Sequence, residues 1–137
     1  MNWLMNDPKH SPRLDAPRVL LVDDERDLRS AMVRYLTISG FAVTEAANGE
    51  AAIAAIDAGP CFHFLLTDLQ LPDVDGIEVA RHARSISPTI WIALITGWPL
   101  ESDDPRVQQI DHVLLKPVNL AELCLRLKDR SSTNGTD

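Results

Sequence analysis

Short apolar runs recur along the chain, and each one ends at polar or turn-forming residues. The runs lie at 18–22, 41–46, 63–67, 90–95 and 112–115. Their length and nearly continuous apolar character are typical of strands that are buried on both faces of a parallel sheet. The third run stops abruptly at Asp68, and Pro72 and Gly76 then favour a loop. The pattern therefore predicts five buried strands, with an acid at the exposed end of the third.

Apolar residues at helical spacing fill the intervals between these runs. The pattern predicts helices over about 25–39, 49–58, 77–85, 104–109 and 119–129. Pro99 and Pro105 leave room for only a short fourth helix, with Pro105 tolerated in its first turn. Asn119, with Glu122 three residues later, is predicted to cap the last helix.

Strands that alternate with helices favour a doubly wound α/β fold with right-handed crossovers. We expect a five-stranded parallel sheet in a (βα)5 arrangement and, by analogy with small domains of this class, the flavodoxin-like strand order 2-1-3-4-5. The domain is predicted over residues 17–129, between a flexible N-terminal arm at 1–16 and a polar C-terminal tail at 130–137. The apolar triplet Trp3-Leu4-Met5 in the arm is interpreted as incidental and not as a docking motif.

The length and the net charge of the chain argue against several classes of function. A chain of 137 residues has room for one domain, so no DNA-binding domain is expected, and its net charge of −7 disfavours non-specific attraction to nucleic acid or anionic membranes. Its apolar runs are far shorter than the ~20 residues of a spanning helix, and the N-terminus does not resemble a signal peptide. We therefore expect a cytoplasmic protein without membrane attachment. Cys61 and Cys124 are predicted to be buried or half-buried free thiols.

Charged and polar residues follow the predicted strands at their carboxyl ends. These residues are Asp23 and Asp24 after the first strand, Asp68 after the third, Thr96 after the fourth and Lys116 after the fifth. In a parallel sheet these ends share one edge, which is where open α/β sheets bind ligands. Two unit charges ~4 Å apart repel by about 4 kcal/mol at an effective dielectric near 20, so three carboxylates need positive charge among them. Lys116 supplies one charge, and a hard divalent cation such as Mg²⁺ would supply the rest.

Relieved of this repulsion, Asp68 suits the role of a carboxylate nucleophile towards a phosphoryl group. The metal and Lys116 would neutralise the charge on the phosphoryl oxygens, and the Thr96 hydroxyl would donate a hydrogen bond to another phosphoryl oxygen. Gly97, which has no side chain, would leave the approach to Asp68 open. Each feature alone is more often a cap or a turn. Their joint occurrence in this order favours the functional interpretation.

The motifs resemble the receiver domain of two-component response regulators over about residues 17 to 129. The matching segments are Val22-Asp23-Asp24-Glu25, Asp68-Leu69-Gln70-Leu71-Pro72-Asp73-Val74-Asp75-Gly76, Thr96-Gly97 and Lys116-Pro117. The resemblance implies that Asp68 accepts a phosphoryl group from the phosphohistidine of a histidine kinase or a histidine phosphotransfer protein.

The resemblance also implies a ligand set. Mg²⁺ would be bound directly by Asp24 and Asp68, through water by Asp23, and by the backbone carbonyl of Gln70. Thr96 and Lys116 would hold the phosphoryl oxygens. The bond between Lys116 and Pro117 would be cis, as X-Pro energetics permit.

Two features depart from the family pattern. Family members usually carry Tyr or Phe three residues before the lysine, where this chain has Val113. The stretch 96–116 is also short and contains two prolines, so the fourth helix is predicted to be stunted. Both departures fall on the face that the family generally uses for output.

We expect a stand-alone response regulator, a monomer or weak dimer, that signals by contact with an unknown downstream protein. It would not be an enzyme beyond self-phosphorylation from small donors and autodephosphorylation. One alternative is a receiver fragment of a hybrid histidine kinase. A second is a haloacid-dehalogenase-type phosphohydrolase, which needs a D-x-D motif where this chain has Asp23-Asp24-Glu25. A third is a binding module that is never phosphorylated.

Overall fold

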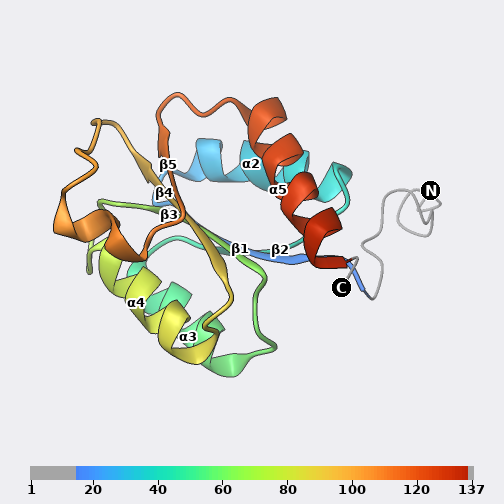
Figure 1. Cartoon of the computed structure of the whole chain (residues 1–137), viewed down its shortest axis with the longest axis horizontal. Helices are drawn as coiled ribbons and strands as arrows, with labels where there is room; N and C mark the ends of the chain where they lie inside the picture. The colour runs from blue at the N-terminus through green and yellow to red at the C-terminus, as the bar shows by residue number, and fades with distance from the viewer. Residues whose placement is uncertain (1–14, 136–137) are drawn as a thin grey trace.

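The computed structural model describes the backbone of residues 15–135 and the side chains as far as residue 131 (Figure 1). Its strands are β1 (Arg18–Val22), β2 (Ala42–Ala46), β3 (Phe64–Asp68), β4 (Trp91–Thr96) and β5 (His112–Leu115). Its helical elements are α2 (Arg26–Ile38), α3 (Gly49–Ala58), α4 (Gly76–Ile86), the 3-10 helix η1 (Pro105–Gln109) and α5 (Leu120–Gly135). The five strands therefore lie where the apolar runs predict them.

The strands form one parallel sheet in the order β2-β1-β3-β4-β5. Figure 1 shows α2 and α5 on one face of this sheet and α3 and α4 on the other. This arrangement confirms the predicted doubly wound α/β class and the flavodoxin-like order 2-1-3-4-5. All parallel neighbours direct their carboxyl ends to the same edge, so the fold brings the strand-end residues together.

Two apolar cores lie on the two sides of the sheet. In β1, Val19 and Leu21 belong to the core under α2 and α5, whereas Leu20 and Val22 belong to the core over α3 and α4. Successive side chains of a strand point to opposite faces, which explains this division. All four residues have no exposed surface, and complete burial of such a side chain contributes about 1.5–3 kcal/mol. The central strands are thereby held on both faces.

Side-chain oxygens cap three of the helices at their amino ends. Asn48 Oδ1 accepts from Ala51 N at 2.8 Å before α3, and Asp75 Oδ1 accepts from Ile77 N at 2.8 Å before α4. Before α5, Asn119 Oδ1 accepts from Glu122 N at 3.0 Å, as predicted. Each bond satisfies one of the N–H groups that a helix leaves unpaired at its start.

The connection between β4 and β5 contains a short helix where the fourth helix is predicted, at 104–109, but it is a 3-10 helix and not an α-helix. It holds only the 3-10 helix η1, because Pro105 lacks an N–H donor and the Asp104 carboxylate tightens the first turn by accepting from Arg106 N at 2.9 Å. The other four predicted helices are α-helices. Helix α5 continues to Gly135, so most of the segment predicted as a polar tail is helical.

The two cysteines also differ from each other. Cys124 is buried on α5 as predicted, but Cys61 is exposed, because it lies in the turn between α3 and β3 and not on a core face. The triplet Trp3-Leu4-Met5 lies outside the described residues. Within residues 15–135, no helix has the length and apolar character needed to cross a membrane.

Candidate functional site

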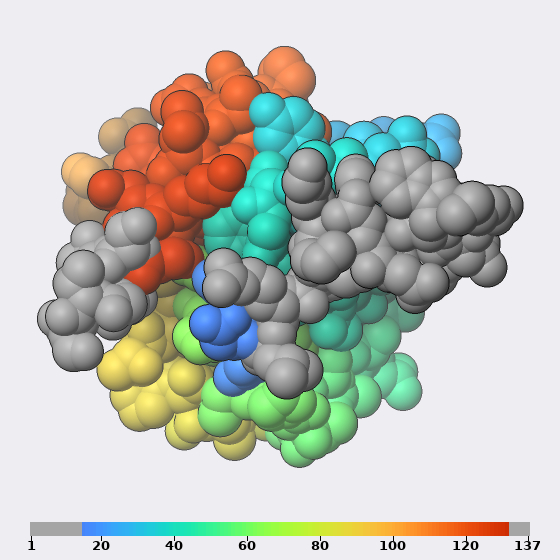
Figure 2. Space-filling model, turned by 90° about the vertical axis from the view of Figure 1, so that its right-hand side faces the viewer, coloured from blue at the N-terminus to red at the C-terminus, as the bar shows by residue number. Residues whose placement is uncertain are grey.

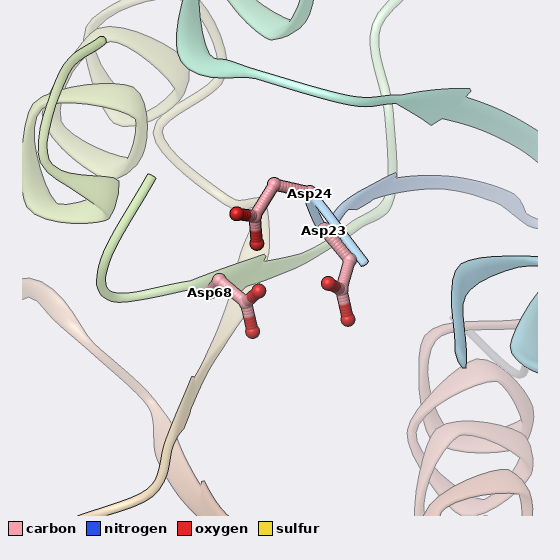
Figure 3. A group of neighbouring side chains, drawn as sticks. All are labelled: Asp23, Asp24 and Asp68. Carbon is pink, nitrogen blue, oxygen red and sulfur yellow. The ribbon is translucent and has the colours of Figure 1, made fainter. Parts of the chain in front are cut away.

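The carboxyl ends of four strands meet at one edge of the sheet and carry the predicted site residues. Asp23 and Asp24 directly follow β1, Asp68 and Thr96 are the last residues of β3 and β4, and Lys116 directly follows β5. Figure 3 shows the side chains of Asp23, Asp24 and Asp68 lying close to one another. One oxygen from each of these three carboxylates lies within 4.8 Å of the others. The structure thus brings together residues that are far apart in the sequence.

A cavity of about 330 Å³ opens at this edge beside Asp68. Its lining consists of Asp24, Asp68, Leu69, Gln70, Leu71, Pro72, Ile95, Thr96, Gly97, Trp98 and Lys116. Lys116 Nζ lies 3.2 Å from Asp68 Oδ1 and forms an ion pair with it. Two carboxylates, a lysine and a threonine therefore line one cavity.

Burial makes the Asp68 carboxylate unusual. Its side chain is 3% exposed, and Asp23 has no exposed surface at all, whereas Asp24 is exposed. Desolvation by burial, followed by the interactions with Asp23, raises the pKa of Asp68 to about 7 against the lowering effect of Lys116. Burial is the largest single effect on Lys116 and lowers its pKa, but the interactions with Asp68 and the charges of Asp23 and Glu25 together outweigh burial and leave that pKa raised.

Two carboxylate oxygens in this cluster lack a hydrogen-bond partner among the described residues. They are Asp23 Oδ2 and Asp68 Oδ2, whereas Asp68 Oδ1 has the ion pair with Lys116 Nζ at 3.2 Å. Buried polar atoms are normally paired, so unpaired oxygens at one site call for an explanation. Hard divalent cations take carboxylate and carbonyl oxygens as ligands, and Mg²⁺ usually binds through one or two carboxylates. The donor set of this cluster therefore fits Mg²⁺.

Arg29 on α2 holds the loop that carries Asp23. Its Nη1 donates to the backbone oxygen of Asp23 at 2.8 Å, and its Nε donates to Glu45 Oε1 at 2.8 Å. Asp23 Oδ1 in turn accepts from Glu25 N at 2.8 Å. The sequence analysis missed Arg29, although a cation near the amino end of a helix opposes the helix dipole and indicates a partner elsewhere.

The loop after Asp68 is packed tightly against the end of β3. Gly76 N donates to Leu69 O at 2.8 Å, and a Cβ at Gly76 would lie 2.0 Å from the backbone oxygen of Asp68. The Asp73 carboxylate accepts from Gly49 N at 2.9 Å and from Glu50 N at 2.8 Å, which joins this loop to the start of α3. The role of Asp73 was also missed, because its partners lie on another element.

The remaining predicted residues lie on the other side of the cavity. Thr96 is 4% exposed, and its Oγ1 accepts from Trp98 N at 3.1 Å. The bond between Lys116 and Pro117 is cis, as the resemblance implies. Val113, at the position where the family usually has an aromatic residue, is half-buried on β5.

Comparison with known proteins decides the family. The family model of the response regulator receiver domain matches residues 19–128. This chain belongs to that family. The receiver domain is 40% identical over 111 residues to the response regulator receiver protein CpdR of Brucella abortus (strain 2308), a match that covers 77% of this chain and 89% of CpdR. Other curated relatives are longer, and the chain spans only 18% to 46% of their lengths.

Solved structures show the same fold. A CheY-like response regulator receiver domain protein from Methanospirillum hungatei JF-1 is 25% identical with a TM-score of 0.81, over 89% of this chain and 98% of that one. The response regulator TrrA from Thermotoga maritima, solved in complex with Mg²⁺ and BeF, is 28% identical with a TM-score of 0.74, over 82% of this chain and 97% of that one. The receiver fold is that of a signalling domain of two-component systems.

Proposed function

We propose that this receiver domain accepts a phosphoryl group on Asp68 in a Mg²⁺-dependent reaction. The observation that carries the proposal is the buried Asp68 carboxylate, whose Oδ1 lies 3.2 Å from Lys116 Nζ and whose Oδ2 has no hydrogen-bond partner among the described residues. A carboxylate that is kept in such a place at a cost in desolvation is characteristic of a functional group. The TrrA complex with Mg²⁺ and BeF supports the same interpretation for a relative of this fold.

The reaction transfers the phosphoryl group to a carboxylate oxygen of Asp68. The P–N bond of the donor phosphohistidine breaks, the new P–O bond forms on Asp68, and the imidazole leaves with the electron pair of the broken bond. In this proposal, Lys116 and the Thr96 hydroxyl interact with the phosphoryl oxygens. Attack requires the ionised carboxylate, and the neighbouring charge of Lys116 favours that form.

The Mg²⁺ ligands that we propose are Asp24 and Asp68 directly, Asp23 through water and the backbone carbonyl of Gln70. When bound, Mg²⁺ neutralises the charge that develops on the phosphoryl oxygens. The chain itself supplies the buried acids, the cation of Lys116, and the loop contacts of Arg29 that hold Asp23 in place.

Receiver domains interact with histidine kinases or phosphotransfer proteins, and we propose such a protein as the phosphoryl donor. We further propose a stand-alone cytoplasmic regulator that acts as a monomer or weak dimer and passes its signal on by contact with a downstream protein. Similarity to CpdR, which is named a receiver protein, supports this proposal. The only chemistry proposed for the domain itself is self-phosphorylation from small donors and autodephosphorylation.

Intact-mass measurement tests the phosphoacceptor. Incubation with acetyl phosphate or phosphoramidate and Mg²⁺ should add one phosphoryl group to the wild-type protein and none in EDTA. Asp68→Asn should remain unmodified, whereas Asp103→Asn, which removes an exposed acid outside the site, should still be labelled. Undiminished labelling of Asp68→Asn would show that another residue is the acceptor.

A phosphohydrolase would behave differently from a receiver domain. Steady release of p-nitrophenol from p-nitrophenyl phosphate over many turnovers would contradict the proposal, since a receiver is modified once and dephosphorylates itself. Phosphotransfer profiling against the histidine kinases of the source organism would then identify the donor. Rapid transfer from one kinase, lost in Asp68→Asn, is the expected result.

A further inference from the structure

A second cavity lies at the amino edge of the sheet, at the opposite ends of the strands from Asp68. Its volume is about 420 Å³, and its lining consists of Arg18, Cys61, Phe62, His63, Ser87, Thr89, Ile90 and Arg130. These residues belong to the start of β1, the segments that precede β3 and β4, and the second half of α5. In Figure 2 the blue start of β1 lies close to the green, yellow and red segments that carry them. We call this cavity the amino-edge cavity.

Every charged side chain that lines the amino-edge cavity within the described part of the chain is basic, although the chain has a net charge of −7. Neither Arg18 nor Arg130 forms an ion pair with a carboxylate among the described residues. Arg18 Nε donates to the backbone oxygen of Cys61 at 2.8 Å, and the Arg130 guanidinium lies 5.9 Å from the centre of the Trp91 ring. Both guanidinium groups thus keep N–H donors without an anionic partner.

His63 adds a donor whose position the backbone fixes. Arg18 N donates to His63 Nδ1 at 2.9 Å, so the neutral ring carries its proton on Nε2. Burial and then the charge of Arg18 lower the pKa of His63, which keeps the ring in this neutral form at pH 7.5. Ser87 and Thr89, which carry hydroxyl groups, also line the cavity.

We propose that the amino-edge cavity binds a small phosphate-containing anion. The planar fork of a guanidinium matches the oxygens of a phosphate group, and charge-assisted hydrogen bonds of this kind are about twice as strong as neutral ones. Among the described residues, no carboxylate lines the cavity to repel the anion. The cavity is also larger than the one beside Asp68, which leaves space for either free phosphate or the phosphate of a nucleotide.

An NMR titration of the full chain with inorganic phosphate in EDTA at pH 7.5 tests the proposal. The backbone amides of Arg18, His63 and Thr89 and the indole of Trp91 should shift and saturate together. The amides of Thr96 and Gly97 should not follow them, because they lie at the opposite edge of the sheet. Shifts confined to Thr96 and Gly97 would place phosphate at the Asp68 site and would overturn the proposal.

Substitutions localise the binding. Arg18→Gln and Arg130→Gln should each weaken phosphate binding about tenfold, as expected for the loss of one charge-assisted contact. Arg81→Gln removes the same charge from the exposed surface of α4 and should leave the affinity unchanged. Equal weakening in all three variants, or in none, would contradict the proposal. Their folding is verified from the dispersion of the same spectra.

The ligand class is separated by three parallel titrations. Adenosine monophosphate binding more tightly than inorganic phosphate would identify a nucleotide site, and equal affinities would identify a site for phosphate itself; both results support the proposal. Acetate binding as tightly as phosphate would overturn it in favour of a general anion site. None of these results depends on whether Asp68 is phosphorylated, so they test the cavity separately from the proposed function.

Discussion

Asp68 is placed where its own ionised form is unfavourable in the metal-free protein. The carboxylate is almost completely buried, Asp23 lies beside it without any exposed surface, and Lys116 is its only cationic partner among the described residues. When such a carboxylate is ionised, it destabilises the folded protein unless a bound cation neutralises its charge. A site of this kind is kept for its function and not for stability. The pKa of Asp68 is therefore raised to about 7, so its effect on stability can be measured around neutral pH.

The stability of the metal-free protein should therefore fall as Asp68 ionises. Its folded-state pKa of about 7 lies above the ordinary 3.8, so the protonated carboxyl favours the fold. This contribution is fully present below pH ~4 and is lost as the pH rises through about 7. Urea unfolding in EDTA at several pH values measures this loss. As the pH rises through this range, the free energy of unfolding should fall by on the order of a few kcal/mol more in wild type than in Asp68→Asn, since each pKa unit corresponds to about 1.36 kcal/mol. Parallel curves for the two proteins would contradict the raised pKa.

Trp98 should report events in the cavity beside Asp68. Its side chain is 68% exposed and lines that cavity. Trp91 is 6% exposed and is the first residue of β4, at the opposite edge of the sheet from Trp98. Addition of Mg²⁺ with beryllofluoride, which imitates the phosphoryl group, should shift the tryptophan emission. The shift should disappear in Trp98→Phe and persist in Trp91→Phe. A signal carried entirely by Trp91 would show that the cavity loop does not respond.

At the scale of elements, the sequence predicts the strands better than the connection between β4 and β5. Continuous apolar runs identify buried strands, because burial on both faces leaves few other solutions. The position of η1 depends on contacts that are distant in sequence. Arg84 on α4 donates to the backbone oxygens of Ile90 at 2.6 Å and Gln109 at 2.8 Å, and to Asp111 Oδ2 at 3.0 Å. This anchor holds the end of η1 against α4, and no local pattern predicts it.

The close approach of α4 to β3 gives a prediction for the loop after Asp68. Gly76→Ala should destabilise the protein by about 1–3 kcal/mol, the usual cost of inserting atoms into a packed site, because its Cβ would overlap the Asp68 backbone oxygen at 2.0 Å. Gly97→Ala is the matched control, since a Cβ there has no atom within 4 Å. Urea unfolding measures both. Similar midpoints for the two variants would show that the loop yields without cost.

At the scale of the molecule, the two edges of the sheet carry opposite charge. The carboxyl edge gathers three acids around Lys116, and the amino edge gathers Arg18 and Arg130 around a separate cavity. The acids were predictable, because parallel strands direct their carboxyl ends to one edge and each acid ends or follows an apolar run. The basic cavity was not, because its residues precede the strands or lie late on α5, and only packing of the helix onto the sheet joins them.

Metal binding should link the acidic edge to the stability of the whole molecule. Without metal, Asp24→Asn should raise the melting temperature slightly, because Asp24 repels two buried carboxylates. The gain in the free energy of unfolding should be less than about 1 kcal/mol, since Asp24 is exposed and its charge is screened by solvent. Mg²⁺ binds the folded site and scarcely the unfolded chain, so at ten times its Kd it should stabilise wild type by roughly 1.4 kcal/mol. The same addition of Mg²⁺ should stabilise Asp24→Asn much less, because this variant has lost a ligand.

Asp103→Asn is the control. It removes an exposed acid outside the cluster, so its stabilisation by Mg²⁺ should equal that of wild type. Melting curves that show equal Mg²⁺ stabilisation in all three proteins would mean that Asp24 is a turn residue and no part of the metal site.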